Sequence, residues 1–298
     1  MNQHIFFDNL TATIGALATG KKKFFSQSLK SQGFSALINN TEIHLSGKFQ
    51  EGTYELEAET PVGILDPAFK VVKWHGNNFP TIIYHHGNNE RPFDFRKSAK
   101  NTFFQIFVNS PEEIKANLIV VRAPFHNSSI KAYQEKMTDL QNFATMIATS
   151  VKLNEAIISE LSSKGCDKIL TSGISLGGWV TNLHRSYFNT STVYIPLMAG
   201  TFLGELFIRS KYKKLTSENA LKNAEALKNV LNFDEAFKKV NSPNVFPLLG
   251  RYDQFIEYQV QKESYTGHPV KVIKNGHITG ALNTKALRNH ILDVLQKN

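Results

Sequence analysis

The sequence contains a single cysteine, Cys166, among its 298 residues. No intrachain disulfide can form, and the cysteine content gives no indication of an oxidising compartment. Long apolar runs are also absent, since none approaches the roughly 18 to 20 residues that a membrane-crossing helix requires. The mildly apolar residues 10–19 follow an acidic residue and precede lysines, which is the reverse of the charge order in a secretory signal. We expect a cytoplasmic protein without a membrane span.

Motifs for bound cofactors are missing as well. No Gly-x-Gly-x-x-Gly segment opens a dinucleotide site, so a redox cofactor is not implied. His85 and His86 are adjacent, but neither a helical His-Glu-x-x-His pairing nor Cys–His spacing accompanies them. Residues 15–22 approach a phosphate-binding P-loop, except that Lys22 stands where a Ser or Thr hydroxyl should bind Mg²⁺. We therefore expect no metal, no nucleotide and no redox cofactor.

Acidic residues are fewer than basic ones. The chain has 34 Lys and Arg against 25 Asp and Glu, which gives a formal charge of +9. Because the basic residues are mostly scattered along the chain, we expect a solvated surface and no nucleic-acid partner. With 41% hydrophobic and 20% charged residues, the composition is that of an ordinary globular protein. No feature of the sequence specifies an oligomeric state.

The hydrophobic pattern changes along the chain. Between about residues 34 and 72, segments such as 42–47 and 53–58 alternate polar with apolar residues, as half-exposed antiparallel strands do. Unalternating apolar runs follow, separated by longer helical stretches, which is typical of parallel strands buried between layers of helices. The pattern predicts an α/β fold with a mostly parallel central sheet and helices on both faces. The apolar runs lie at residues 81–84, 118–121, 169–170, 193–195, 245–249 and 270–273.

The clearest helix is expected over residues 139–164. Apolar residues recur there near helical spacing, and the resulting stripe should face the sheet. Thr138 and Gln141 have the spacing of a capping box at its start, and Gly165 can end it. This helix should be a main element of one of the two covering layers.

The remaining segments define the expected organisation. Residues 200–243 are rich in Lys, Asn, Ala and Leu, and we interpret them as a helical lid or cap insertion. Residues 1–33 are expected to form an N-terminal extension packed on the core, and residues 34–298 a single domain that includes the insertion. Apolar side chains near the start of the insertion are expected in the core, and some of them can wall a pocket. These are Phe202, Leu203, Leu206 and Phe207.

The most informative motif is Gly-Ile-Ser-Leu-Gly at residues 173–177, directly after an apolar run. A serine that attacks a carbonyl needs its Oγ lifted clear of the backbone, and a sharp strand-to-helix turn achieves this in strained φ/ψ space. Gly173 and Gly177 allow neighbouring backbone to approach without a Cβ clash. An ordinary turn between a strand and a helix is the alternative for Ser175, so other residues must decide.

Two further residues have the required positions. Asp253 and His277 follow the last two expected strands, as Ser175 follows an earlier one, and open α/β sheets place their sites just past such strand ends. His277 would take the proton of the serine hydroxyl, and Asp253 would orient the imidazole. A turn or cap residue is the alternative for Asp253, and a loop histidine for His277. Glu257 and Asp234 are reserve acids.

Taken together, these elements resemble the α/β-hydrolase superfamily over most of the chain. The Gly-x-Ser-x-Gly turn and the chain order Ser, acid, His belong to that fold. Residues 84–88, Tyr-His-His-Gly-Asn, resemble its His-Gly turn after an early strand. The resemblance implies that the backbone amides of Leu176 and Asn88 form an oxyanion hole. It also implies that His86 and Gly87 support the loop.

The resemblance implies a serine hydrolase that cleaves a carboxylic ester, or a thioester, of a small-molecule acyl substrate through an acyl-enzyme on Ser175, with no cofactor. Two alternatives stay open. A peptidase or amidase can use the same triad, because pocket geometry sets the leaving-group chemistry. A hydrolase fold can also be catalytically inactive and serve as a binding protein, although an intact triad argues against that.

Overall fold

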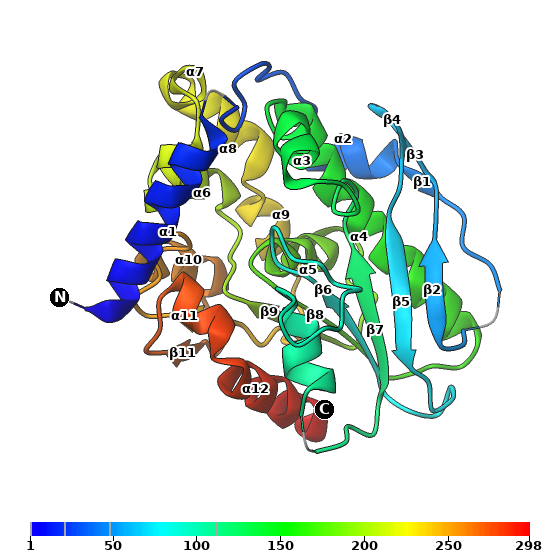
Figure 1. Ribbon diagram of the computed structural model, residues 1–298. Coiled ribbons are helices and arrows are strands. Elements are labelled where there is room, and N and C mark those ends of the chain that lie inside the picture. The colour runs from blue at the N-terminus through cyan, green and yellow to red at the C-terminus, as the bar shows by residue number, and fades with distance from the viewer. Residues whose placement is uncertain (1, 21, 48, 111) are drawn as a thin grey trace.

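The structure is a computed structural model that describes residues 2–20, 22–47, 49–110 and 112–298. Its centre is a twisted sheet of eight strands (Figure 1). The strands lie in the order β11 (Lys271–Ile273), β10 (Leu248–Gly250), β9 (Val193–Leu197), β8 (Ile169–Ile174), β6 (Thr81–His85), β7 (Asn117–Arg122), β5 (Ala68–Lys73) and β2 (Gly52–Glu55). Strands β6 to β11 are parallel, whereas β5 and β2 pair antiparallel at one edge. The predicted fold class is confirmed.

The antiparallel part is divided between two sheets. Of the two alternating segments, residues 53–58 contribute residues 53–55 to β2 of the large sheet, whereas residues 42–47 provide only the short strand β1 (Glu42–Ile43). This strand pairs with β3 (Ala58–Thr60), which pairs with β4 (Gly63–Leu65) in a separate small sheet. The alternation therefore predicted strands correctly but overestimated their length.

The expected strand at residues 245–249 begins later than the apolar run. Val245 forms only an isolated bridge with Tyr194, and β10 starts at Leu248. Pro247 lies between them and has no amide hydrogen to donate to a neighbouring strand, which interrupts regular pairing. The shorter strand still ends at Gly250, so the loop after it keeps its expected place.

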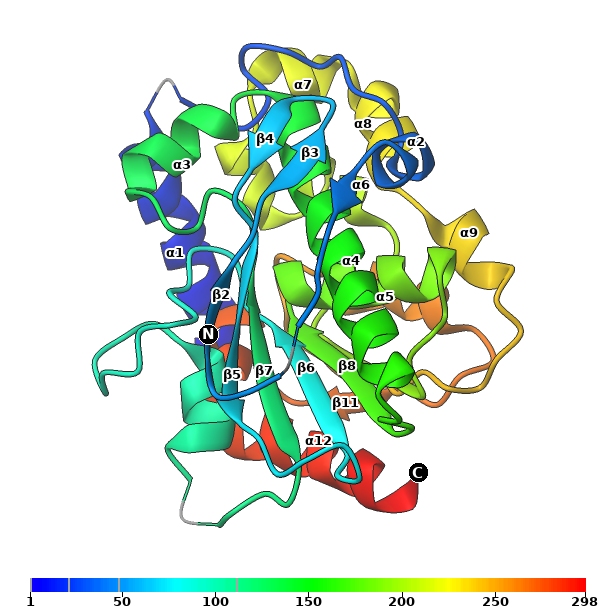
Figure 2. The ribbon, with the colours of Figure 1, turned by 90° about the vertical axis from the view of Figure 1, so that its right-hand side faces the viewer.

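Helices cover both faces of the sheet (Figure 2). Helices α4 (Leu140–Ser163) and α5 (Leu176–Tyr187) lie on one face, and α12 (Thr284–Lys297) with the helical turn η1 (Phe104–Val108) on the other. Successive residues of a strand point to opposite faces. In β6, Ile83 packs in one cluster with side chains of α4, and Ile82 packs in another with side chains of α12.

The long helix matches its expected range within a residue at each end, but its cap differs. The side chain of Asp139 accepts hydrogen bonds from the backbone amides of Gln141 and Asn142, at 2.8 and 3.3 Å. The hydroxyl of Thr138 instead donates to the carbonyl of Glu135, so the proposed capping box was wrong. A carboxylate at the N-cap satisfies the free amides and also suits the positive end of the helix dipole. Gly165, with φ of +82°, follows the end of the helix.

Residues 200–243 fold into short helical segments around the carboxyl edge of the sheet. Side chains of this region, including Phe207 and Leu227, are buried in the same core cluster as residues of α4 and α5. The segments are α6 (Leu203–Ile208), η2 (Lys211–Leu215), α7 (Glu218–Lys222), α8 (Ala224–Leu231) and α9 (Asp234–Lys238). Shorter helices elsewhere are α2 (Phe34–Asn39), α3 (Ile130–Lys136), α10 (Tyr258–Gln261), η3 (Lys262–Tyr265) and α11 (His277–Leu282).

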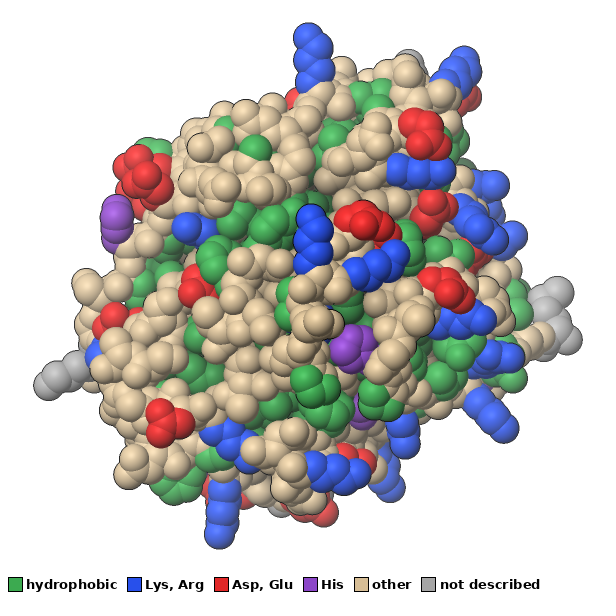
Figure 3. Space-filling model, turned by 180° about the vertical axis from the view of Figure 1, so that it is seen from behind, with side chains coloured by type: hydrophobic (Ala, Val, Ile, Leu, Met, Phe, Trp, Pro, Cys, Tyr) green, Lys and Arg blue, Asp and Glu red, His purple; other side chains and the backbone are tan. Residues whose placement is uncertain are grey.

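The N-terminal segment begins with helix α1 (Gln3–Thr19), which packs against η2 and α11 (Figure 1). The chain then turns inward, and the rings of Phe24 and Phe25 are buried in the core. Residues 15–19 belong to α1, so the P-loop-like segment does not form a loop after a strand. No helix within the described ranges is long and apolar enough to span a bilayer. On the face in Figure 3, basic side chains are spread over several regions and interspersed with acidic ones.

Candidate active site

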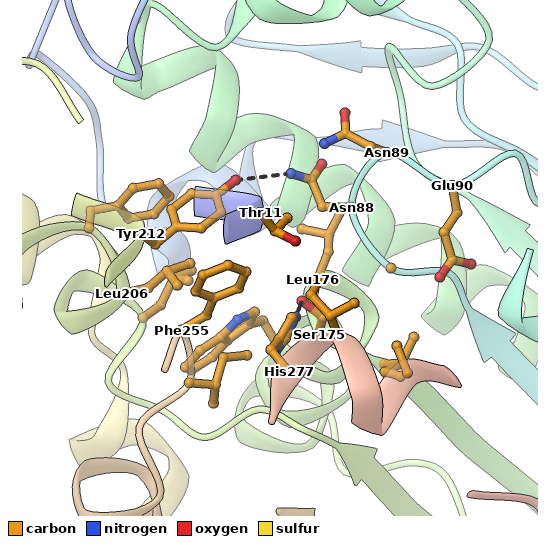
Figure 4. A pocket seen from close by; sticks show the side chains of 18 of the residues that line it. Thr11, Asn88, Asn89, Glu90, Ser175, Leu176, Leu206, Tyr212, Phe255 and His277 are labelled. Atoms are coloured by element: carbon orange, nitrogen blue, oxygen red, sulfur yellow. Dashed lines mark hydrogen bonds between the residues drawn. The ribbon is translucent and has the colours of Figure 1, made fainter. Parts of the chain in front are cut away.

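Three residues from separate loops meet at the carboxyl edge of the sheet. Ser175 follows β8, Asp253 lies in the loop after β10, and His277 begins α11 after β11. The Oγ of Ser175 lies 3.1 Å from Nε2 of His277, and Nδ1 of His277 lies 2.8 Å from Oδ2 of Asp253. Figure 4 shows the first of these contacts at the floor of a pocket. The structure therefore brings together the three side chains that the sequence proposed as nucleophile, base and acid.

Ser175 stands in a strained turn. Its φ of +53° and ψ of −109° are unusual for a residue with a side chain, and this conformation is typical of a nucleophile elbow. The flanking glycines have a clear steric cause. A Cβ at Gly173 would lie 2.5 Å from the carbonyl group of Gly177, and a Cβ at Gly177 would collide with the carbonyl oxygen of His85. The two glycines let α5 approach β8 and β6 closely enough to form the turn.

Both carboxylate oxygens of Asp253 have hydrogen-bond partners. While Oδ2 of Asp253 faces His277, Oδ1 accepts hydrogen bonds from the amides of Phe255 and Ile256, at 2.8 and 2.7 Å. The side chain is buried, so these bonds orient it without competition from solvent. The reserve acids are engaged elsewhere, since Glu257 pairs with Arg209 and Asp234 pairs with Lys238.

The electrostatic setting of His277 favours its protonated form. Burial is the largest single influence and lowers the pKa of this imidazole, whereas the carboxylate of Asp253 raises it by charge and by hydrogen bonding. The charge of Asp8 adds to this effect, whereas Lys100 opposes it. The net result is a pKa above the usual 6.5. Such a base accepts a proton from a hydroxyl more readily than an unperturbed imidazole.

The two amides proposed for an oxyanion hole are free to donate. The backbone N–H groups of Leu176, at the start of α5, and of Asn88 have no hydrogen-bond partner among the described residues. The side chain of Asn88 is held on both sides, because its oxygen accepts from Tyr133 at 2.6 Å and its nitrogen donates to Tyr212 at 3.3 Å. The two tyrosines belong to α3 and η2, so these elements fix the loop after β6.

Hydrogen bonds of His86 and Gly87 hold the loop after β6 in place. The amide of Ala123 donates to Nε2 of His86 at 3.1 Å, which leaves the ring proton on Nδ1. That proton is directed at the carbonyl oxygen of Gly87, 2.6 Å away. Burial, together with His126 and His85, holds the pKa of His86 well below its usual value, so the ring is neutral. Within the described ranges no three His, Cys, Asp or Glu side chains are arranged to hold a metal ion.

A further acid, Asp8 of α1, was not foreseen from the sequence. It is fully buried, and its Oδ2 accepts from the amides of Gln254 and His277 at 3.0 and 2.8 Å. Its Oδ1 accepts from the amide of Ile278 at 2.9 Å. One carboxylate therefore joins the loop of Asp253 to the start of the helix that begins with His277. Burial and the nearby charge of Asp253 raise the pKa of Asp8.

The sequence contained one signal for this role. Asp8 is the only Asp, Glu, Lys or Arg in the 17 residues of α1, and a lone acid in an otherwise uncharged helix suggests a specific partner. Its partners are backbone amides more than 240 residues away, as the separations of 246, 269 and 270 residues show. Nothing in local spacing identifies amides as partners.

The pocket above Ser175 is small and largely apolar. It has a volume of about 160 Å³. Three of the four apolar residues singled out near the start of the insertion line it, namely Leu203, Leu206 and Phe207, while Phe202 does not. Trp179 of α5 and Phe255 add aromatic surface beside His277. An uncharged acyl group would find apolar contacts there and the hydroxyl of Ser175 at its base.

Comparisons with known proteins identify the fold. No protein-family model and no curated protein matches this sequence. Solved structures do resemble it. An acylaminoacyl peptidase from Pyrococcus horikoshii superposes with a TM-score of 0.56 at 13% identity, over 83% of this chain and 42% of the peptidase chain. The Pf2001 esterase from Pyrococcus furiosus superposes with a TM-score of 0.52 at 12% identity, over 85% of this chain and 98% of the esterase chain.

Acetyl xylan esterase 1 from Thermoanaerobacterium sp. JW/SL YS485 gives a TM-score of 0.53 at 12% identity, over 86% of this chain and 92% of that one. These similar structures are α/β-hydrolases. The chain therefore has the α/β-hydrolase fold, as its motifs suggested. It spans less than half the length of the peptidase but nearly the whole length of both esterases.

We predict that Gly177→Ala destabilises the protein and lowers turnover. The added methyl group would collide with the carbonyl of His85 and push α5 away from β6, at a cost of about 1–3 kcal/mol or more. Urea unfolding measures the loss. Gly33→Ala is the matched control, because a Cβ at Gly33 meets no atom within 4 Å and should change stability by less than about 0.5 kcal/mol. Equal stability of the two variants would contradict the steric account.

We predict that Asp8→Asn shifts the acidic limb of the pH–kcat/KM profile to lower pH. His277 must be neutral to accept a proton, and the charge of Asp8 favours its protonated form. Removing that charge lowers the pKa of His277, so activity persists further into acid. The maximal rate should fall as well, because one amide oxygen replaces two carboxylate oxygens. Asp139→Asn, which removes a carboxylate at the start of α4, is the control, and a profile of Asp8→Asn that coincides with it would refute the coupling.

Proposed function

We propose that this protein is a serine hydrolase that cleaves a carboxylic ester, or a thioester, of a small acyl substrate through an acyl-enzyme on Ser175. The observation that supports this most strongly is the continuous line of contacts from Asp253 through His277 to Ser175, with the serine in a strained turn. In this proposal the catalytic residues are Ser175, His277 and Asp253, and no metal or cofactor takes part.

The reaction begins with proton transfer. Nε2 of His277 removes the hydroxyl proton of Ser175 as Oγ forms a bond to the carbonyl carbon of the substrate. Asp253 keeps the proton of the neutral ring on Nδ1, so that Nε2 is the free base, and it stabilises the imidazolium that results. The raised pKa of His277 fits this role, because an imidazole with a higher pKa is a stronger base.

The tetrahedral intermediate places a negative charge on the former carbonyl oxygen. We propose that the amides of Leu176 and Asn88 bind this charge, since both are unpartnered and both residues line the pocket with Ser175. One such donor typically contributes about 3 kcal/mol to transition-state stabilisation. When the intermediate collapses, the imidazolium of His277 gives its proton to the leaving alcohol or thiol. Water then attacks the acyl-enzyme by the same steps, which releases the carboxylic acid and restores Ser175.

The share of each similar structure's length that this chain covers favours ester cleavage over peptide cleavage. The chain matches the two esterases over 92% and 98% of their lengths, but the peptidase over only 42%. The pocket is also largely apolar, which suits an acyl group. Peptidase or amidase activity with the same residues is the second candidate, and the structural similarity to the acylaminoacyl peptidase is the observation in its favour.

We predict that a fluorophosphonate probe labels Ser175 and that Ser175→Ala abolishes the labelling. Turnover of p-nitrophenyl acetate should fall by about three orders of magnitude or more, because the nucleophile is lost while the fold remains. Ser172→Ala is the control, since its buried hydroxyl donates to the carbonyl of Ile195 and lies outside the pocket. Labelling that survives in Ser175→Ala would refute the assignment. A wild-type protein that is neither labelled nor active would instead indicate a hydrolase-fold binding protein.

We predict that Leu206→Trp selects against longer acyl chains. Leu206 is half-buried and lines the pocket, so a larger side chain there should fill space that the acyl group needs (Figure 4). The ratio of kcat/KM for p-nitrophenyl octanoate to that for the acetate should fall at least about tenfold, which corresponds to about 1.4 kcal/mol. Leu292→Trp, on the far side of the sheet in α12, is the control. An unchanged ratio in Leu206→Trp would show that the acyl group lies elsewhere.

A further inference from the structure

Helix α1 exposes an unusual row of large apolar side chains. Phe6, Phe7, Leu10, Ile14 and Leu17, here called the α1 stripe, are 47%, 45%, 42%, 57% and 78% exposed. They make up five of the eleven exposed large apolar residues in the described part of the chain. Isolated exposed apolar residues need no explanation, but a contiguous set on one helix indicates an interaction site.

The stripe occupies one face of the helix. At about 100° per residue, its five positions fall within an arc of about 100°. The buried residues Asp8, Ala12 and Thr19 lie on the opposite face, where they attach α1 to the protein. A surface helix normally turns its apolar face inward, and α1 has the reverse arrangement. Attachment through Asp8 therefore leaves the apolar face available to something outside the chain.

Positive charge borders the stripe. The ammonium group of Lys214 lies 2.9 Å from the hydroxyl of Thr13, which is next to the stripe on the helix surface. The neighbouring Lys211 and Lys213 of η2 are also exposed. The only acid of α1, Asp8, is buried, so the exposed surface of this helix has no carboxylate. An apolar strip with lysines beside it is complementary to a layer of acyl chains beneath anionic head groups.

The stripe is continuous with the entrance to the active site. Thr11 of α1 lines the pocket above Ser175. Ile14 of the stripe lines an adjoining cavity of about 460 Å³, which also has Ile130 of α3 and the exposed Lys100 in its wall. Thr11 and Lys100 border both cavities. A molecule that passes from the α1 stripe to Ser175 therefore remains in contact with apolar side chains and meets a lysine on the way.

We propose that the α1 stripe docks this protein on an anionic lipid surface, and that its substrates are acyl esters within that surface. The docking is inferred from the exposure of the α1 stripe, the lysines beside it and the position of α1 next to the active site. The substrate class rests in addition on the hydrolase function proposed above. Pairing between two copies of the chain explains these observations less well, because two stripes in contact would bring the lysines of both rims together. The phosphate groups of a lipid surface would neutralise the same lysines.

Vesicle sedimentation tests the docking. The wild-type chain should bind vesicles of phosphatidylcholine with about 30% phosphatidylglycerol more tightly than vesicles of phosphatidylcholine alone, and added salt should weaken the binding. Leu17→Glu should reduce the affinity at least about tenfold, because a carboxylate would enter the lipid interface. Ile64→Glu is the matched control, since Ile64 is 69% exposed on β4, away from α1 (Figure 1), and should bind as the wild type does.

Three results would overturn the docking. The first is equal binding of Leu17→Glu and the wild type, and the second is no binding of the wild type to the anionic vesicles. The third is a dimer in analytical ultracentrifugation that Leu17→Glu converts to monomers, in a protein that does not bind vesicles. Ser175→Ala should bind as the wild type does, and Leu17→Glu should hydrolyse a soluble acetate ester at the wild-type rate. Vesicle binding without any hydrolysis would thus refute the hydrolase function and leave the docking intact.

Discussion

The contact on which the rest of the site depends is the alignment of the His277 ring between Asp253 and Ser175. Each of the three residues lies on a different loop, and small shifts of any loop would separate atoms that are now 2.8 and 3.1 Å apart. Backbone amides provide the rigidity, because Asp253 binds two amides of its own loop and Asp8 binds amides of both loops. Carboxylates that accept hydrogen bonds from several amides in a buried setting are strongly oriented, so in the proposed reaction the imidazole of His277 would be positioned before substrate binds.

Helix α1 has one face that contacts the loops of the site and an opposite face that is exposed. Its inner face supplies Asp8, while His4 stacks on Tyr252 and contacts the hydroxyl of Thr279, so the helix is attached at several points to the loops beside His277. Its outer face exposes the α1 stripe. A lipid surface that contacts the outer face would therefore act on the segment that also holds the acid and base in register. In the proposed docking, the same 17-residue helix would carry both the lipid contact and Asp8.

The sequence predicted the sheet well and predicted that Ser175, Asp253 and His277 follow strand ends at one edge of it, because both depend on local patterns. Unalternating apolar runs identify buried parallel strands, and polar residues directly after them must lie at one edge of the sheet. The remaining features depend on distant partners. Asp8 binds amides far along the chain, and Tyr133 and Tyr212 meet Asn88 only after α3 and η2 have folded over the pocket. The cap of α4 was assigned to Thr138 instead of Asp139 because both residue types cap helices and only geometry distinguishes them.

The elements outside the sheet are also the ones that can distinguish this chain from the proteins it resembles. At 12–13% identity, the three comparisons show a shared fold only. The strained serine turn follows from the close approach of α5 to the sheet, which any protein of this fold must achieve. Part of the pocket wall instead comes from α1, α6 and η2, through side chains such as Thr11, Leu206 and Tyr212. Substrate selection should therefore change with substitutions in these helices, while the bond-breaking chemistry stays with the strand ends.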